Sequence, residues 1–247
     1  MIIDAHVHMG VPSRPAFGNA MAYTAEDLLR NMDRAGIDMS LVMAIPHVYD
    51  NDYIIDAWRR HEDRLIPWAY IDPWHHPRPE QSIRQLAEEG FRGIKLRAVS
   101  LRYHLSDHVL LDPILEACRV NNLLVSMHTG DEPSCTPLQV KEMATAFPDL
   151  TFILIHGGFR MLIEEAIAVA KACPNVYIDQ TAGSSWQLKR AVEELSPRKL
   201  IYGSDSPFMD TRVELKRFRE VITEPADLSL ALGGNAARLY GIKGAQS

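Results

Sequence analysis

Apolar runs that alternate with helical patterns along the whole chain constrain its fold more than any other feature. Runs rich in β-branched and aromatic residues recur, and segments with apolar residues three and four positions apart separate them. Strands that alternate with helices form parallel βαβ units. Eight units in 247 residues predict an α/β fold, a single (β/α)8 barrel over residues 1–247, with an open doubly wound sheet as the structural alternative. We expect the strands at Ile2–His8, Met39–Pro46, Ile66–Ile71, Gly93–Arg97, Leu123–His128, Thr151–His156, Val176–Asp179 and Leu200–Ser204.

Capping residues mark the ends of several expected helices. Thr24 is expected to cap a helix that ends at Gly36. The segments MLIEEAIAVAKAC and QLKRAVEELS also have clear helical periodicity. Pro113 predicts that the first part of SDHVLLDPILEACRVNN is a turn or a kinked helix start. Asn235 is expected to cap the last helix.

Composition excludes several classes of partner. The net charge is −6 and no basic stripe is visible, which disfavours nucleic-acid binding. No apolar run approaches the roughly 20 residues of a membrane span, and no secretory signal is visible. Three scattered cysteines without CxxC spacing are typical of reduced thiols. We therefore expect a cytoplasmic protein without a nucleic-acid or membrane partner.

The first strand places polar side chains at every second position. Asp4, His6 and His8 should share one face, and Ala5 and Val7 the face that packs under the outer helices. If the polar face lines a barrel, the two imidazoles can converge on one ion. Asp4 would lie two positions deeper inside, where it could orient neighbouring groups or simply be a hydrogen-bonded core residue.

Three other strands end in side chains that can bind a metal. His128 ends LLVSMHTG, His156 ends TFILIHGG, and Asp205 ends LIYGSDSP, in which Gly203 leaves space inside the barrel. Each alone has an ordinary structural explanation. Their coincidence with His6 and His8 at the end where barrels keep their sites predicts a metal centre. Histidine and carboxylate ligands suit one divalent ion, first of all zinc, with manganese, iron or cobalt as alternatives.

Such an ion lowers the pKa of a bound water towards about 7. Asp205 could then accept the proton of the water as general base, and His156 could hydrogen-bond the water or stabilise negative charge on the substrate.

The fourth strand, GFRGIKLRAVS, adds two basic residues. Lys95 and Arg97 should project into the barrel, because Ile94 and Leu96 occupy the alternate positions. Arg97 lies nearer the active end and is the candidate for binding a substrate carboxylate, with an ion pair at the barrel mouth as the alternative. The loops add aromatic and imidazole groups that could line a pocket: His47, Tyr49, Trp74, His75, His76, Tyr103 and His104.

Five segments together resemble the amidohydrolase superfamily, and within it the amidohydrolase-2 branch of metal-dependent hydrolases and decarboxylases with a TIM-barrel fold. They are DAHVH, HTG, IHGG, YGSDSPF and GGNAARLYGI, in the order of the family. The resemblance implies a single divalent ion bound by His6, His8, His128 and Asp205. It implies that His156 lies beside the water or substrate, or binds a second metal. Because some binuclear members carry a carbamylated lysine on the fourth strand, Lys95 is a candidate ligand of that second metal. An interior lysine can equally pair with an acid or with a substrate anion, which is the alternative for Lys95.

The resemblance leaves the reaction open. We expect a hydrolase that uses a metal-activated water on a small organic substrate, such as a cyclic amide, lactone or ester that could also carry a carboxylate. The alternative is a decarboxylase of an aromatic or unsaturated carboxylic acid. TatD-type nucleases share the histidines and aspartate but carry a glutamate on the fourth strand, which GIKLR lacks. A non-catalytic binding barrel is a further alternative. By analogy of fold, a homo-oligomer could complete the pocket.

Overall fold

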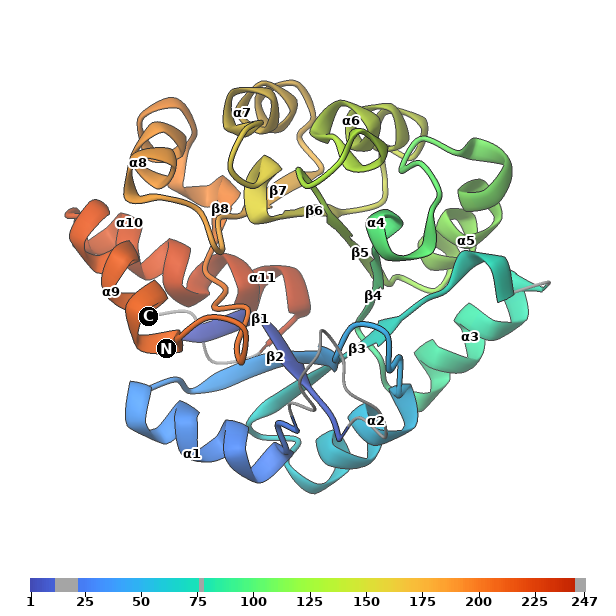
Figure 1. Ribbon diagram of the computed structural model, residues 1–247, viewed down its shortest axis with the longest axis horizontal. Helices are drawn as coiled ribbons and strands as arrows, with labels where there is room; N and C mark the ends of the chain where they lie inside the picture. Colours follow the sequence, from blue (N-terminus) through green and yellow to red (C-terminus); the bar gives the residue numbers. More distant parts are fainter. Residues whose placement is uncertain (12–21, 76–77, 243–247) are drawn as a thin grey trace.

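The computed structural model describes residues 1–11, 22–75 and 78–242, and its centre is a parallel barrel. The eight strands lie in sequence order around the barrel, and each pairs in parallel with the next (Figure 1). The eight expected strands and the barrel are therefore confirmed. Their bounds are β1 Ile3–Met9, β2 Met39–Ala44, β3 Leu65–Tyr70, β4 Gly93–Leu96, β5 Leu124–His128, β6 Phe152–Ile155, β7 Val176–Asp179 and β8 Leu200–Ile201.

Helices surround the barrel on the outside (Figure 1). Thr24 forms the expected capping box with Asp27 at the start of α1, and Gly36 ends that helix in a left-handed conformation. The helices are α1 Ala25–Ala35, α2 Asn51–Arg60, α3 Pro79–Glu89, α4 Ala98–Leu101, α5 His108–Val120, α6 Pro137–Ala146, α7 Ile163–Ala172, α8 Ser185–Glu194, α9 Thr211–Val221, α10 Pro225–Ser229 and α11 Asn235–Tyr240.

Two local expectations concern helix ends. Of the two alternatives for the segment before Pro113, the turn is wrong: the segment is the start of α5, because the Asp107 side chain accepts a hydrogen bond from the Leu110 backbone and the helix begins at His108. Asn235 does not cap α11 with its side chain. Its amide instead donates to the carbonyls of Pro197 and Leu200, at 2.8 Å each, and ties α11 to the start of β8.

Backbone hydrogen bonds between β1 and the segment after β8 close the barrel. Ala5 donates to the Tyr202 carbonyl at 3.0 Å, and His8 donates to the Ser206 carbonyl at 2.7 Å. Asp205 donates in return to the His6 carbonyl at 2.7 Å. The short strand β8 thus continues as an ordered segment beside β1, and this pairing brings Asp205 next to the two histidines.

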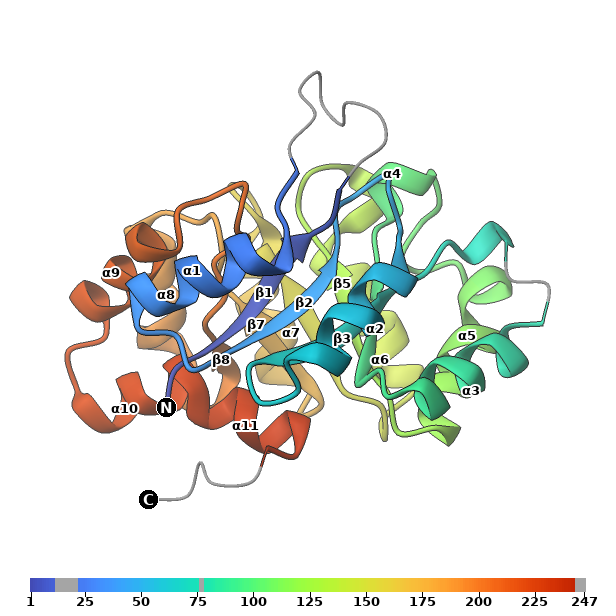
Figure 2. The same cartoon turned by 90° about the horizontal axis from the view of Figure 1, so that it is seen from below.

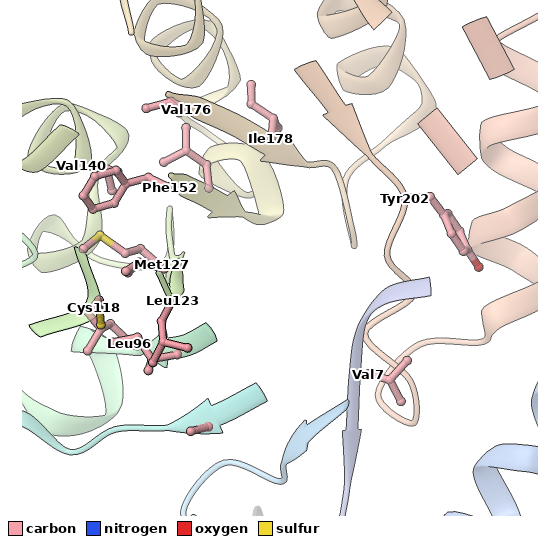
Figure 3. Close-up of a cluster of buried hydrophobic side chains, with 14 of the residues drawn as sticks. Val7, Leu96, Cys118, Leu123, Met127, Val140, Phe152, Val176, Ile178 and Tyr202 are labelled. Carbon is pink, nitrogen blue, oxygen red and sulfur yellow. The ribbon is translucent and has the colours of Figure 1, made fainter. Parts of the chain in front are cut away.

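Two apolar clusters hold the barrel together. Outward-facing strand residues pack against the helices, with Met127, Phe152 and Val176 among them (Figure 3). A smaller cluster fills the barrel interior, and Tyr240 from α11 packs there against Trp68 with ring centroids 5.5 Å apart. Figure 2 shows α11 at the end of the barrel where the N-terminus lies, opposite α4. One end of the barrel is therefore plugged, and the carboxyl ends of the strands form the other.

The expected alternation along β1 is wrong in its first half. The register of β1 against β2 shifts between Asp4 and Val7, as in a β-bulge. Ala5 consequently belongs to the interior cluster, although Val7 faces the helices as expected. Asp4 pairs with Ser40 on the helix-facing side and not inside the barrel below His6.

Two further features concern the cysteines and the length of the helices. Cys118, Cys135 and Cys173 are free and buried. No helix in the described part of the chain is long and apolar enough to span a bilayer.

Candidate metal centre

Three side chains converge at the junction of β1 and the segment after β8. The Nε2 atoms of His6 and His8 are 3.2 Å apart, and each lies 3.4 Å from Oδ1 of Asp205. Ligand atoms about 2.0–2.1 Å from a tetrahedral ion lie about 3.3–3.4 Å from one another. The triangle formed by His6, His8 and Asp205 therefore has the dimensions of one face of such a coordination sphere.

The outer ring nitrogens of the two histidines fix their tautomers. Nδ1 of His8 lies 2.8 Å from the Ala44 carbonyl, which can only accept, so this nitrogen carries the hydrogen. Nδ1 of His6 lies 2.8 Å from Oδ2 of Asp179 and donates in the same way. When such a ring binds an ion, the lone pair of its Nε2 is the ligand, and both Nε2 atoms lie on the side of Asp205. Metal-binding histidines show this pattern of outer hydrogen bonds.

Charge at the site favours a cation. Burial lowers the pKa of His8 to about 4, so its ring is neutral at pH 7. Burial raises the pKa of Asp205, but His6 and His8 outweigh that effect and hold the pKa below its usual range. An ionised carboxylate and two lone pairs that converge within hydrogen-bonding distance fit a divalent ion. Across the described ranges, this is the one group of three such side chains with all ligand atoms within 4.8 Å.

Unusual backbone conformations present the site residues. Asp205 has a φ of 57° and His156 a φ of 66°, values that are uncommon for residues other than glycine. Gly203 makes room for the site, because a Cβ atom there would lie 2.7 Å from Cβ of His6 and 3.0 Å from Oδ1 of Asp179. The expectation that Gly203 leaves space inside the barrel is thus confirmed.

His128 and His156 lie beside the triangle. Their ring centroids are 4.7 Å apart, and His156 is 5.2 Å from His6. Nε2 of His128 lies 2.6 Å from Oδ2 of Asp131, outside the group of three ligands. Nδ1 of His156 lies 3.3 Å from the Thr181 carbonyl and donates to it, so Nε2 carries the lone pair and can accept a hydrogen bond. Burial lowers the pKa of His156 to about 3, so the ring is neutral.

Two acids that the sequence analysis did not single out support these histidines. Asp179 ends β7, as His128 ends β5, and the same strand-end rule would have found it. Its Oδ1 accepts hydrogen bonds from Thr181, so both carboxylate oxygens are used. Asp131 lies in the loop after β5, where no sequence periodicity applies. Asp4 acts from the helix-facing side, where its Oδ1 accepts from the Ser204 backbone at 2.8 Å, one residue before Asp205.

A cavity of about 210 Å³ opens over the triangle. Lys95 and Arg97 lie in its wall, as the sequence predicted. Arg97 donates to the Ser100 hydroxyl, and the expected alternative, an ion pair with an acid, is not found for it in the described part of the chain. The lining is completed by His8, Pro46, His128, Asp131, His156, Phe159, Ala182, Asp205, Phe208 and Met209.

The loop residues expected to line a pocket do not do so. Tyr103 is buried in the outer core, and none of the other described candidates lines the cavity. His76 lies outside the described residues. The apolar part of the wall comes instead from residues after β2, β6, β7 and β8, which are Pro46, Phe159, Ala182, Phe208 and Met209.

Comparisons with known proteins bear on this site. A family model described as amidohydrolase matches residues 3–242. No curated protein matches the chain significantly. Solved structures share the fold at low identity, and at such identities the likeness establishes the fold alone.

Three of these structures are informative. A probable 2-pyrone-4,6-dicarboxylic acid hydrolase from Acinetobacter baumannii has 16% identity and a TM-score of 0.79, with 97% of this chain and 99% of that chain covered. The 5-carboxyvanillate decarboxylase of Sphingomonas paucimobilis has 16% identity and a TM-score of 0.77, with 97% of this chain and 98% of that chain covered. The 5-carboxyvanillate decarboxylase of Novosphingobium aromaticivorans, in complex with manganese, has 14% identity and a TM-score of 0.77, with 98% of this chain and 96% of that chain covered.

Proposed function

Because the chain belongs to the amidohydrolase family of metal-dependent hydrolases and decarboxylases, we propose that it is a metal-dependent hydrolase of a small organic substrate. The observation that carries the proposal is the convergence of Nε2 of His6, Nε2 of His8 and Oδ1 of Asp205. These three groups would hold one divalent ion, and we propose His128 as the fourth ligand. Zinc is the first candidate, with manganese, iron and cobalt as alternatives.

The neighbouring side chains suit hydrolysis. A bound divalent ion would supply a water of lowered pKa and polarise the bond to be cleaved. Asp205 is ionised and can accept a proton at Oδ2. His156 is neutral, and its Nε2 can accept a hydrogen bond from a water or substrate in the same cavity. Asp131 orients His128, since it accepts from that ring.

The cavity supports a substrate of one ring that carries a carboxylate. Its volume of about 210 Å³ is small for a ligand pocket, and a cavity of roughly 150 Å³ can hold benzene. Arg97 can bind a carboxylate with two parallel hydrogen bonds. A lactone, cyclic amide or ester of this size is the proposed substrate class. The ring acids named for the structural neighbours agree with it.

Decarboxylation of an aromatic or unsaturated acid is the second candidate. Several structural neighbours are described as 5-carboxyvanillate or 2,6-dihydroxybenzoate decarboxylases. The family resemblance implies that the same metal ligands serve both reactions. A second ion bound by His156 and a carbamylated Lys95 stays a prediction, as does a homo-oligomer that completes the pocket.

Metal analysis combined with an activity screen tests the proposal. The purified protein should contain about one equivalent of a divalent ion, lose activity with a chelator, and regain it with zinc or manganese. The screen should cover ring lactones, amides, esters and carboxylic acids, with water incorporation and carbon dioxide release as separate readouts. His128→Ala should lose metal and activity together. Full retention of tightly bound metal in this variant would remove His128 from the ligand set.

A further inference from the structure

Lys95 is the least explained charged side chain in the barrel. It is only 1% exposed, and its Nζ atom has no hydrogen-bond partner among the described residues. An unpaired buried ammonium group costs several kcal/mol, so proteins rarely keep one without a counter-charge. Lys95 nevertheless lines the cavity over the candidate metal centre.

The acids around the cavity contact other side chains than Lys95. Asp131 accepts from His128, Asp179 from His6 and Thr181, and Asp205 faces His6 and His8. None of them lies within ion-pair distance of Lys95. Their negative charges attract Lys95 only from beyond that distance, so within the described part of the chain no acid forms a direct ion pair with it.

Two further donors lie on the same side of the barrel. Arg97 is two residues beyond Lys95 and lines the same cavity without an acid partner within the described ranges. Tyr70 pairs with Lys95 in the register of β3 and β4, and its buried hydroxyl also has no partner in the part of the chain that the structure describes. Burial raises the pKa of Tyr70 well above 10, so it stays a neutral donor.

We propose that Lys95 and Arg97 form an anion subsite that holds a substrate carboxylate distinct from the group that reacts. Three of the proposed metal ligands, His6, His8 and Asp205, lie on β1 and after β8, which are far from β4 in the order of the strands around the barrel. A small ring would then be held at one side by its carboxylate and present the scissile bond to the candidate metal centre. Burial lowers the pKa of Lys95 to about 7 in the free protein, and a bound anion would raise it again.

This inference rests on the proposed function for the location of the reacting group, but its test needs no catalysis. Benzoate and benzamide have nearly the same shape and differ in charge. Their affinities would be measured by calorimetry at low ionic strength on the full chain after removal of metal by a chelator. We expect benzoate to bind the unmodified protein about tenfold or more tightly than benzamide.

Variants assign that preference to residues. Lys95→Met and Arg97→Met should each weaken benzoate binding about tenfold or more and leave benzamide binding nearly unchanged. Lys189→Met, on the exposed surface of α8, is the matched control and should change neither affinity. Equal affinities for the two probes, or an undiminished preference for benzoate in both site variants, would overturn the proposal.

Carbamylation of Lys95 is a separate outcome, because it would make this side chain an anion. Carbon-13 NMR with labelled bicarbonate would detect it, and a carbamate signal that disappears in Lys95→Met would also overturn the proposal. If the protein binds metal and hydrolyses substrate but does not prefer benzoate, only the proposed anion subsite is refuted. If it prefers benzoate but binds no metal, the anion subsite is supported and the proposed function is refuted.

Discussion

The two sides of the cavity satisfy their polar groups in opposite ways. On the side of β1 and the segment after β8, His6 and His8 have partners for their outer ring nitrogens, and both rings converge with Asp205 on a single point. On the side of β3 and β4, the Lys95 ammonium and the Tyr70 hydroxyl are buried without partners within the described residues.

This difference separates two kinds of preorganisation. The first side is fixed by the protein itself, since Asp179 and the Ala44 carbonyl set the ring orientations before any ion binds. The second side keeps unsatisfied donors, which only a ligand with acceptor groups can satisfy. We infer that the first side carries the reaction and the second selects the substrate.

Asp205→Asn should have the largest effect, because it removes the only carboxylate of the triangle. We expect metal affinity to fall at least about 100-fold and activity to fall with it. Metal content after dialysis and activity at fixed metal concentration measure the two losses. Asp63→Asn, an exposed residue between α2 and β3, is the control. Unchanged metal content in Asp205→Asn would contradict the assignment of this ligand.

Gly203→Ala should displace His6 and so disturb the metal-binding side of the cavity. The added Cβ would lie 2.7 Å from Cβ of His6, and both atoms belong to the rigid barrel interior. We expect roughly tenfold or greater loss of metal affinity with a modest loss of stability. Gly234→Ala has its nearest neighbour at 3.3 Å, in a flexible Leu230 side chain, and should leave metal binding intact. Equal metal titration curves for the two variants would show that the position of His6 is not critical.

Lys95→Met, unlike the two previous variants, should increase the stability of the metal-free protein. Burial lowers the pKa of Lys95 from 10.5 to about 7. Below pH 7 the buried charge therefore lowers the free energy of unfolding of the metal-free protein by its full amount. That cost declines as the pH rises through the window from 7 to 10.5, because the unfolded chain binds the extra proton there. The variant should therefore be more stable by on the order of a few kcal/mol at pH 7 and by less at pH 9. Urea unfolding at the two pH values tests the sign, and a variant less stable than the unmodified protein at pH 7 would show that Lys95 has a partner in the fold.

Asp131→Asn should have the smallest effect of the four. The Asn side chain can still contact His128 but binds its ring hydrogen less strongly, so we expect about 10-fold weaker metal binding or activity. Asp63→Asn, at an exposed position, is again the control for metal binding and activity. A loss as large as that of Asp205→Asn would mean that Asp131 contacts the ion or the substrate directly.

The sequence predicted the barrel and most of this site because both follow periodic rules. Strand and helix periods placed all eight strands, and the strand-end rule found His128, His156 and Asp205. The rule failed at Asp4 and Ala5, because one extra residue in β1 reverses the side-chain alternation before His6 and leaves no mark in the sequence.

Positions outside the strands were harder to predict. Asp131 and the apolar wall come from loops, whose conformation depends on tertiary contacts such as the approach of Gly130 to Gly158. The unpaired state of Lys95 also depends on the whole barrel. Alternation placed this side chain inside, but only the three-dimensional arrangement shows that every nearby acid is already engaged.

The location of the ion tests the central claim most directly. Crystals of the full chain grown with manganese or zinc would be measured at the anomalous edge of the added metal. The account predicts one strong peak enclosed by Nε2 of His6, Nε2 of His8 and Oδ1 of Asp205. The absence of a peak at this position with saturating metal, whether or not an ion binds elsewhere, would contradict it.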